Sequence, residues 1–467
     1  MCLIRLSRNA FVRFRNGFVY VENQANHVVM TFRDDIDVQL FERISRQPVR
    51  LAELIGSVSF PQEEVKDRIA LYESRWFVVS GHDEVALNAA EHDFSYASAK
   101  EVEQMFSDVP FPDTKEEGLW LRSLQVELTS HCNEKCIHCY IPGQTKICGL
   151  NMPLEMACRI VDEFAGMGGL RIIFSGGELF LYKHIKEVLS YCRQKDLMIF
   201  LQSNMTLVDD AMLDFIKEQN VFNIQVSLYS TDEQVHDSIT RLRGSWQKTR
   251  TCLEKLVSRD IPALISCPLM QQNYEDYRKM MDYAESIGVF CYVDYIMLAQ
   301  NDFCTDNVCA TRLTLEQTGH LLDEMLDNDP GYRRMIDSVR SREDLDTMLF
   351  AHRFTKCEIL KNSMCVGAGG DVYPCPAWQA MNIGDLNSQT LEEIWTTSEK
   401  AHQLRNLDRT KFLKCGSCSY HNYCDMCAVY NYNENNGDLY EPCRRFCEVA
   451  RMMKNKVTER CRNKGLL

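Results

Sequence analysis

The chain has 467 residues, of which 45% are hydrophobic and 25% are charged, and its formal net charge at pH 7 is −14. This composition is ordinary for a soluble globular protein of about three domains, and the negative charge argues against broad electrostatic binding to nucleic acid or to an anionic membrane. No apolar run reaches the eighteen or so residues of a membrane span, and the N-terminal segment lacks a signal peptide's uninterrupted apolar core, so we expect a cytoplasmic protein.

The first 80 residues predict a small α+β unit. Alternating apolar residues in FVRF, FVYVEN and HVVMTF indicate three strands, and helical periodicity in DVQLFERISR, LAELIGSV and PQEEVKDRIALYESRWF indicates three helices. Residues 1–50 hold eight arginines against five acidic residues, which is a locally basic balance. Residues 82–117 are acidic and end in two prolines, so they predict a linker with one helix.

From residue 119 to about 300, strand and helix patterns alternate. Six crossover-linked strands require a parallel sheet, open or closed into a partial barrel, with functional groups at the carboxyl ends of the strands. The apolar strand candidates are 124–130, 171–176, 197–204, 223–230, 263–270 and 291–298.

Cysteine is the outlier of the composition, with 22 residues. In a reducing compartment, so many thiols indicate metal or redox ligands rather than disulfides. One cluster lies directly after the first strand of the predicted sheet, in TSHCNEKCIHCYIPG, where Cys132, Cys136 and Cys139 have the spacing C-x3-C-x2-C. Three thiolates in one run leave the position of a fourth ligand open.

Three further motifs follow the next strands in chain order: SGGE ending at Glu178, SN with Asn204, and VSLYS. Two adjacent glycines let the backbone approach a ligand, and a carboxylate offers an acceptor to an ammonium group. Together with the cysteines, this succession resembles the radical S-adenosylmethionine (SAM) superfamily across the whole central domain.

That resemblance implies that three thiolates hold three irons of a [4Fe–4S] cluster and that SAM chelates the fourth iron. It also implies a set of SAM-contacting residues, with Asn204 on the ribose hydroxyls and Ser227 as a weaker candidate: Gly176, Gly177, Glu178, Ser203, Asn204 and Ser227. The alternative for the cysteines is a zinc site completed by His131, His138 or Cys148.

A second group of cysteines follows the predicted sheet and is similar to the SPASM extension of radical SAM enzymes, which carries two auxiliary [4Fe–4S] clusters. The spacing from Cys424 to the next cysteine is two residues, whereas the family usually has three. By resemblance, one cluster takes Cys357, Cys375, Cys427 and Cys365, and the other takes Cys415, Cys418, Cys424 and either Cys447 or Cys443. A structural zinc ribbon is the alternative.

The N-terminal unit resembles the recognition element that binds precursors of ribosomally made, post-translationally modified peptides (RiPPs). In that element, which is winged-helix-like, the leader of the precursor adds as a strand to an exposed sheet edge. The basic balance of residues 1–50 suits an acidic leader. A winged helix that binds DNA and a simple packing domain are the alternatives.

Other reactive side chains carry weaker expectations. His236, His320 and His352 are expected to be solvated or core histidines, whereas Cys304 and Cys309 follow the sixth strand and are weak candidates for a catalytic or cluster-adjacent role. The catalytic acid or base stays unassigned.

The fold class expected from these patterns is α/β: a partial (β/α)6 radical SAM barrel with an N-terminal winged-helix-like α+β domain and a C-terminal cysteine-rich SPASM domain. The expected divisions are a leader-binding domain at 1–81, an acidic linker at 82–118, a radical SAM core at 119–315, a helical bridge at 316–355, a SPASM domain at 356–447 and a C-terminal helix at 448–467.

By this resemblance the protein is a radical SAM enzyme that removes hydrogen from a precursor peptide through a 5′-deoxyadenosyl radical and forms a cysteine thioether. The implied partners are the precursor peptide and an electron donor such as flavodoxin or ferredoxin, without nucleic acid or membrane. The alternatives are carbon–carbon or carbon–oxygen crosslinking, epimerisation, sulfatase maturation, and a non-catalytic iron–sulfur redox sensor.

Overall fold

A computed structural model describes the chain except for residues 1, 95–117, 144–148, 349–359, 408–410 and 413. Its centre is a mixed sheet that has nine strands among the described residues, in the order β12-β11-β10-β9-β8-β7-β13-β14-β15. Strands β7 to β12 are all parallel to their neighbours, which confirms the predicted α/β fold with a parallel barrel-like sheet. Their bounds are Ser123–Thr129, Arg171–Gly176, Met198–Ser203, Asn223–Ser227, Ala263–Pro268 and Phe290–Asp294.

Helices connect these strands and cover one face of the sheet. Alternate strand residues such as Val126, Phe174 and Leu201 are buried against helical residues such as Ile160 and Leu189 in one core. Local signals set the helix starts, because the Asp209 and Asp232 side chains accept hydrogen bonds from backbone N–H groups of the helices that follow. The helices are α8 Leu154–Gly166, α9 Ile185–Gln194, α10 Asp210–Glu218, α11 Glu233–Thr240, α12 Ser245–Ser258 and α13 Tyr277–Ser286.

The cysteine-rich C-terminal region extends the same sheet. Strand β13 (Ser363–Val366) runs parallel to β7, and β14 (Asp371–Tyr373) and β15 (Gly384–Asp385) continue the sheet in antiparallel fashion. Helices α18 (Leu391–Thr397) and α19 (Glu399–Arg405) follow. The C-terminal region therefore shares hydrogen bonds and a core with the barrel.

The N-terminal unit has more strands than the sequence predicts. The three expected strands form one antiparallel sheet, β2 (Ala10–Arg15), β3 (Phe18–Asn23) and β4 (Val29–Phe32), and three short strands form a second sheet in the order β5-β1-β6. The strands of the second sheet are β1 Leu3–Leu6, β5 Val49–Arg50 and β6 Val78–Gly81, and the helices are α1 Asp35–Arg43, α2 Leu51–Gly56, α3 Gln62–Ser74 and α4 Glu84–Ala89. Helix α4 lies in the segment expected to be the linker, whose residues 95–117 are outside the described part.

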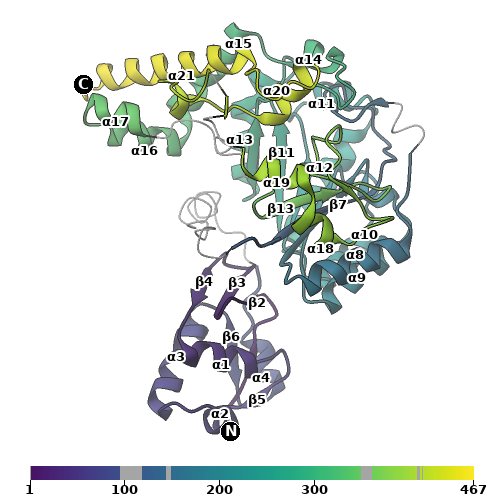
Figure 1. The fold of residues 1–467 in the computed structure, drawn as a ribbon, viewed down its shortest axis with the longest axis vertical. Coiled ribbons are helices and arrows are strands. Elements are labelled where there is room, and N and C mark those ends of the chain that lie inside the picture. Colours follow the sequence, from purple (N-terminus) through teal and green to yellow (C-terminus); the bar gives the residue numbers. More distant parts are fainter. Residues whose placement is uncertain (1, 95–117, 144–148, 349–359, 408–410, 413) are drawn as a thin grey trace.

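The N-terminal unit packs on the barrel at the end where the parallel strands begin (Figure 1). Phe11 and Tyr20 share an apolar cluster with Leu170, Met198 and Phe222, which immediately precede or open strands β8, β9 and β10. Polar contacts reinforce this interface: Arg171 pairs with Glu22 at 2.8 Å, and Arg13 donates to the carbonyl of Gly169 at 2.8 Å. The unit therefore lies opposite the carboxyl ends of the strands.

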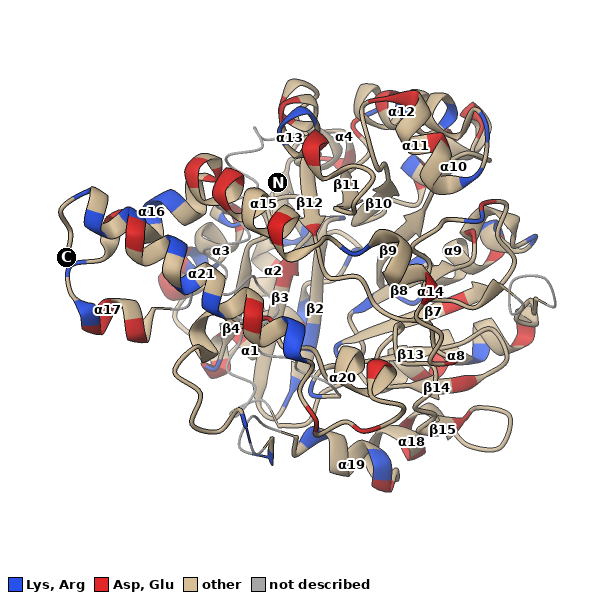
Figure 2. Ribbon diagram, turned by 90° about the horizontal axis from the view of Figure 1, so that it is seen from above, with Lys and Arg blue, Asp and Glu red and all other residues tan. Residues whose placement is uncertain are grey.

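Helices complete the molecule beyond β12. They are α14 Asp306–Thr311, α15 Leu315–Asn328, α16 Pro330–Ser338, α17 Arg342–Thr347, α20 Ala428–Glu434 and α21 Arg444–Asn463. Helix α21 begins at Arg444, before the expected start at 448, and it packs on α15 and α16 through residues such as Leu322, Ile336 and Met453. Helix α15 has acidic residues and no Lys or Arg, and basic residues of α21 pair with it (Figure 2): Arg460 bridges Asp323 and Asp327. Within the described residues, no helix is long and apolar enough to span a membrane.

Candidate functional site

The first cysteine cluster lies in the loop that follows β7, at the carboxyl end of the sheet. Cys132, Cys136 and Cys139 are all half-buried. Backbone hydrogen bonds tie this loop to the end of α11, because Lys135 N–H donates to the Thr240 carbonyl and Ile137 N–H donates to the Ile239 carbonyl, both at 3.0 Å. The loop is thus held in place by the helix that follows the fourth strand of the barrel.

The two glycines of SGGE allow the end of β8 to pass close to the cysteine loop. Gly176 has φ of +146°, and a Cβ on it would lie 2.1 Å from the Thr129 carbonyl oxygen. A Cβ on Gly177 would lie 2.1 Å from the His131 carbonyl oxygen. Side chains at these two positions would therefore separate β8 from the loop that carries the cysteines.

Glu178 links the SGGE and SN motifs. Its carboxyl group is buried and accepts hydrogen bonds from the Ser203 hydroxyl at 2.7 Å and from the Asn204 backbone N–H at 2.9 Å. Burial raises the pKa of Glu178 to about 6, although these hydrogen bonds oppose the shift. The Asn204 side chain donates to Asn133 Oδ1 at 3.0 Å, so the SN motif also contacts the cysteine loop.

A chain of buried side chains that the sequence analysis missed leads to Cys136. Glu134 accepts a hydrogen bond from the Ser245 hydroxyl at 2.5 Å and from the Cys136 thiol at 3.4 Å. His236 accepts from the Tyr229 N–H through Nδ1, so its Nε2 carries the proton and faces Ser245 Oγ at 3.2 Å. His236 is 1% exposed, whereas His320 is exposed and His352 lies outside the described residues.

The face of the barrel sheet that points away from the helices is polar. Gln125 on β7 donates to Ser175 Oγ at 3.1 Å and to Gln202 Oε1 at 3.3 Å, and Gln202 donates to Gln225 at 3.3 Å. We call this the inner face.

Two acidic side chains of the inner face carry raised pKa values, and the sequence analysis named neither. Burial raises the pKa of Glu127, on the first strand of the barrel, to about 7, opposed by a hydrogen bond from Gln379. Burial raises the pKa of Asp294, on the last strand, to about 6. An acidic residue at a strand position that alternates with buried apolar residues is the signal that could have marked both.

The second group of cysteines divides into two neighbourhoods. In the first, Cys365 on β13 and Cys375 lie close enough for their charges to interact, and burial together with Cys427 raises the pKa of Cys375 to about 12. In the second, the charges of both Cys415 and Cys447 act on Lys414.

Cys443, the alternative to Cys447, instead lies by Arg312, Tyr430 and Glu434. Cys357 is outside the described residues. Cys418 and Cys424 flank the short turn His421–Tyr423.

The segment that carries Cys304 and Cys309 docks on the first cysteine loop. Asn301 N–H donates to the Tyr140 carbonyl at 3.1 Å, and the Asn307 amide contacts the carbonyls of His138 and Cys139 at 3.3 and 3.4 Å. Cys304 is half-buried in this segment and Cys309 is exposed on α14.

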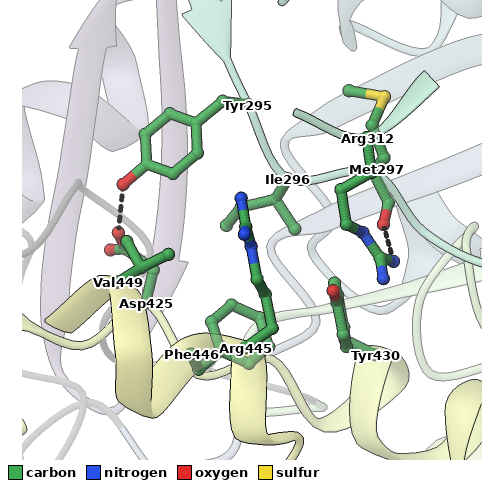
Figure 3. A pocket seen from close by; sticks show the side chains of 9 residues that line it. All are labelled: Tyr295, Ile296, Met297, Arg312, Asp425, Tyr430, Arg445, Phe446 and Val449. Atoms are coloured by element: carbon green, nitrogen blue, oxygen red, sulfur yellow. Dashed lines mark hydrogen bonds between the residues drawn. The ribbon is translucent and has the colours of Figure 1, made fainter. Parts of the chain in front are cut away.

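A pocket lies between the segment that follows β12 and helices α20 and α21. It has an empty volume of about 370 Å³, part of which is open solvent. In Figure 3, Arg445 rises from α21 between Tyr295 and Arg312, and Tyr295 donates to Asp425 at 3.2 Å. The lining residues are Tyr295, Ile296, Met297, Arg312, Asp425, Tyr430, Arg445, Phe446 and Val449.

Family models match two parts of the chain. Residues 126–284 match the radical SAM superfamily, and residues 357–428 match SPASM, an iron–sulfur cluster-binding domain. The chain is a radical SAM enzyme with a SPASM domain. The two matched regions contain the parallel sheet and both groups of cysteines, so the cofactors that they imply are [4Fe–4S] clusters and SAM.

The residues present fit these cofactors. Half-buried thiols, the glycine backbone beside them and the buried acceptor Glu178 converge at one end of the sheet. Among the described residues, no three His, Cys, Asp or Glu side chains converge on one point in the way that a single metal ion requires. The thiolates of an iron–sulfur cube bind different irons and so need not converge on one point.

Curated relatives have more than one activity. The chain is 25% identical over 334 residues to the AdoMet-dependent heme synthase of Methanosarcina barkeri, which covers 68% of this chain and 94% of the relative. It is 24% identical over 321 residues to the antilisterial bacteriocin subtilosin biosynthesis protein AlbA of Bacillus subtilis, covering 66% and 67% of the two chains. Sequence relatives thus leave the substrate of the radical SAM enzyme open.

Among solved structures, Streptococcus suis SuiB bound to its precursor peptide SuiA has the same fold. The TM-score is 0.58 at 15% identity, and the match covers 91% of this chain and 96% of SuiB. The 9% of this chain outside the match is about 42 of 467 residues, fewer than the N-terminal unit contains. SuiB therefore shares at least part of that unit.

Proposed function

We propose that this radical SAM enzyme modifies a ribosomally made precursor peptide and that the bond formed is a thioether from a cysteine to a neighbouring residue. The observation that carries the proposal is that the fold shared with SuiB extends beyond the barrel and the SPASM domain into the N-terminal unit. The heme synthase is matched over 94% of its own length but over only 68% of this chain, so it has few residues left that could form such a unit. SuiB is bound to a precursor peptide in that structure, which supports a peptide as the substrate.

The residues at the carboxyl end of the barrel would bind the cluster and SAM. Cys132, Cys136 and Cys139 would hold the SAM-binding cluster, and Gly176, Gly177, Glu178 and Asn204 would hold SAM beside it. When bound, these groups supply a 5′-deoxyadenosyl radical that removes a hydrogen atom from the peptide. The chain itself binds the peptide, orients it and excludes water.

We assign the auxiliary clusters to the two neighbourhoods of cysteines. One would be held by Cys357, Cys365, Cys375 and Cys427, and the other by Cys415, Cys418, Cys424 and Cys447. Cys447 is favoured over Cys443 because it shares the surroundings of Lys414 with Cys415, whereas Cys443 lies among the pocket residues Arg312 and Tyr430.

The leader of the precursor would add to strand β4. Strands β2 and β4 are the two edges of their sheet, and Arg13 and Arg15 on β2 already reach the barrel at Gly169 and Met167. Strand β4 is the edge left for an added strand. The leader would therefore bind at the end of the molecule opposite the SAM site, and a flavodoxin or ferredoxin would supply electrons.

Thioether formation removes one hydrogen from a carbon and one from a thiol, so the product is lighter by two hydrogens. The test is mass spectrometry of a candidate precursor co-expressed anaerobically, with thiol alkylation and a parallel run in deuterated water. Loss of two hydrogens with one cysteine protected from alkylation is the expected result. The same loss with every cysteine alkylated would move the bond to carbon or oxygen, and deuterium gained without loss would mean epimerisation.

A tetrapyrrole substrate is the second candidate, because the 25% identity to the heme synthase spans nearly that whole relative. If a tetrapyrrole is the substrate, anaerobic expression of the enzyme without any precursor peptide should produce new haem absorbance. Haem formation together with an unmodified precursor would replace the peptide proposal. Activation of a co-expressed sulfatase would instead favour sulfatase maturation.

A further inference from the structure

Glu127 is a buried acidic side chain on the inner face of the barrel. It lies on β7 (SLQVELT), where Ser123 and Gln125 share its face of the strand, and its strand partner on β8 is Ser175. Only 5% of Glu127 is exposed. A buried carboxylate is costly unless several donors surround it, so this side chain requires an explanation.

The neighbouring polar groups do not satisfy Glu127. Gln125, Ser175, Gln202 and Gln225 hydrogen-bond to one another across the inner face. Glu127 takes no part in that ladder. Among the described residues, its hydrogen bonds come from one neutral group, the amide of Gln379, whose Nε2 lies 2.9 and 3.0 Å from the two carboxyl oxygens.

A single NH2 group leaves about half of the acceptor capacity of a carboxylate unused. The two oxygens offer about four lone-pair sites, and Gln379 approaches both oxygens from one side. The amide thereby fixes the orientation of the carboxyl group, while the remaining lone pairs need a donor from elsewhere.

The surroundings of Glu127 place it where the two cysteine groups meet. Its charge acts on Tyr140, which directly follows Cys139 of the first cysteine loop. It also acts on Cys365, on the strand that joins the SPASM domain to the barrel. A peptide bound between the first cysteine loop and the SPASM domain would have this carboxyl group beside it.

We propose that Glu127 accepts a hydrogen bond from the bound peptide, through a backbone N–H or a cysteine thiol, and thereby positions the reacting residue inside the barrel. Gln379, from the SPASM domain, orients Glu127 for this contact. The inference rests on the proposed function and adds the substrate-positioning residue. The competing explanation is that Glu127 and Gln379 only fasten the SPASM domain to the barrel.

Two variants separate these explanations. Glu127→Gln keeps an oxygen for Gln379 to bond, so the link between the domains survives while the charge and the extra acceptor are lost. Gln379→Leu removes the link and keeps the carboxyl group. Both are assayed with the precursor for apparent KM, for kcat and for 5′-deoxyadenosine formed per peptide modified, next to iron content and melting temperature.

The expected result for Glu127→Gln is an apparent KM for the peptide raised about tenfold, as loss of one charged hydrogen bond implies. More 5′-deoxyadenosine is then released per peptide modified, because the peptide is held less well. Iron content and melting temperature stay at the wild-type values. Gln379→Leu has a smaller effect on KM and lowers the melting temperature.

Three results would overturn the inference. Wild-type KM and coupling in Glu127→Gln would show that the peptide does not need this acceptor. If both variants contained less iron and melted at a lower temperature to the same degree, Glu127 and Gln379 would serve only to hold the SPASM domain to the barrel. If Glu127→Gln does not fold, Glu127→Asp retracts the carboxyl by one methylene, and wild-type KM in that variant would equally count against the contact. Failure of the wild-type enzyme to modify any precursor would instead remove the proposed function itself.

Discussion

At the scale of single residues, the hydrogen-bonded chain His236–Ser245–Glu134 supports the first cysteine loop. Ser245→Ala would remove one hydroxyl that donates a hydrogen bond to the buried Glu134 carboxyl group. We expect the free energy of unfolding to fall by about 1–3 kcal/mol, and the yield of reconstituted barrel cluster to fall with it, measured by denaturant unfolding and iron analysis.

The control for this prediction is Ser238→Ala on α11, the helix that precedes Ser245. The Ser238 hydroxyl is exposed and donates only within α11, to the Val235 carbonyl, so its loss should change stability by less than about 0.5 kcal/mol. Equal behaviour of the two alanine variants would mean that the buried chain does not support the loop.

The sequence motifs of the site could be predicted, whereas the buried residues that hold the cysteine loop in place could not. The cysteine spacing, SGGE and SN are contiguous, so they could be recognised without a structure. Glu134 and His236 are about 100 residues apart in the sequence, and Ser245 at the start of α12 links them through one hydrogen bond to each. Glu127 was missed for a related reason, since its partner Gln379 lies on a distant segment.

At the scale of secondary structure elements, the approach of β8 to the cysteine loop depends on glycine. Gly177→Ala places a Cβ within 2.1 Å of the His131 carbonyl oxygen, so the strand end and the loop must separate. We expect the variant to lose most of its iron at the barrel site and its SAM binding, measured by iron analysis and by calorimetric titration with SAM.

Gly143→Ala is the matched control, because the same loop region leaves open space around that position. It should bind iron and SAM as the wild type does. A Gly177→Ala protein with wild-type iron content and SAM affinity would contradict the role given to the close approach.

The barrel strands were predictable because buried parallel strands read as continuous apolar runs. Five of them begin within one residue of the predicted start, and the other, β8, has the predicted bounds. The strands that were missed are short: β5 and β15 have two residues each, β14 has three, and β1, β6 and β13 have four each. Pairing of β13 with β7 joins residues about 240 positions apart, which no local pattern records.

At the scale of the whole molecule, we expect the stability of the interface between the N-terminal unit and the barrel to depend on pH through His27. His27 packs edge-to-face on Phe222 at 5.4 Å, and burial together with Arg171 lowers its pKa to about 4, opposed by Glu22. In the unfolded chain, the imidazole of His27 takes up a proton near pH 6.5, whereas in the folded chain it does so only near pH 4. The contribution of neutral, buried His27 to the free energy of unfolding is therefore complete above pH 6.5 and is lost as the pH falls toward 4.

The melting temperature should therefore decline between pH 6.5 and 4, and His27→Gln should make that decline shallower while lowering the melting temperature at pH 7. Thermal unfolding across this pH range measures both. Parallel curves for the wild type and His27→Gln would exclude His27 as a source of the pH dependence.

The N-terminal unit and the first cysteine loop lie at opposite ends of the barrel, so a precursor that binds both, as we propose, must be long enough to reach from one to the other. The most direct test of the account follows the hydrogen atom. The reduced enzyme is incubated with SAM and a precursor peptide whose core residues carry deuterium on carbon, and the 5′-deoxyadenosine is analysed by mass spectrometry. The account predicts deuterium in 5′-deoxyadenosine, whereas cleavage of SAM that depends on the enzyme but transfers no deuterium from any core residue would contradict it.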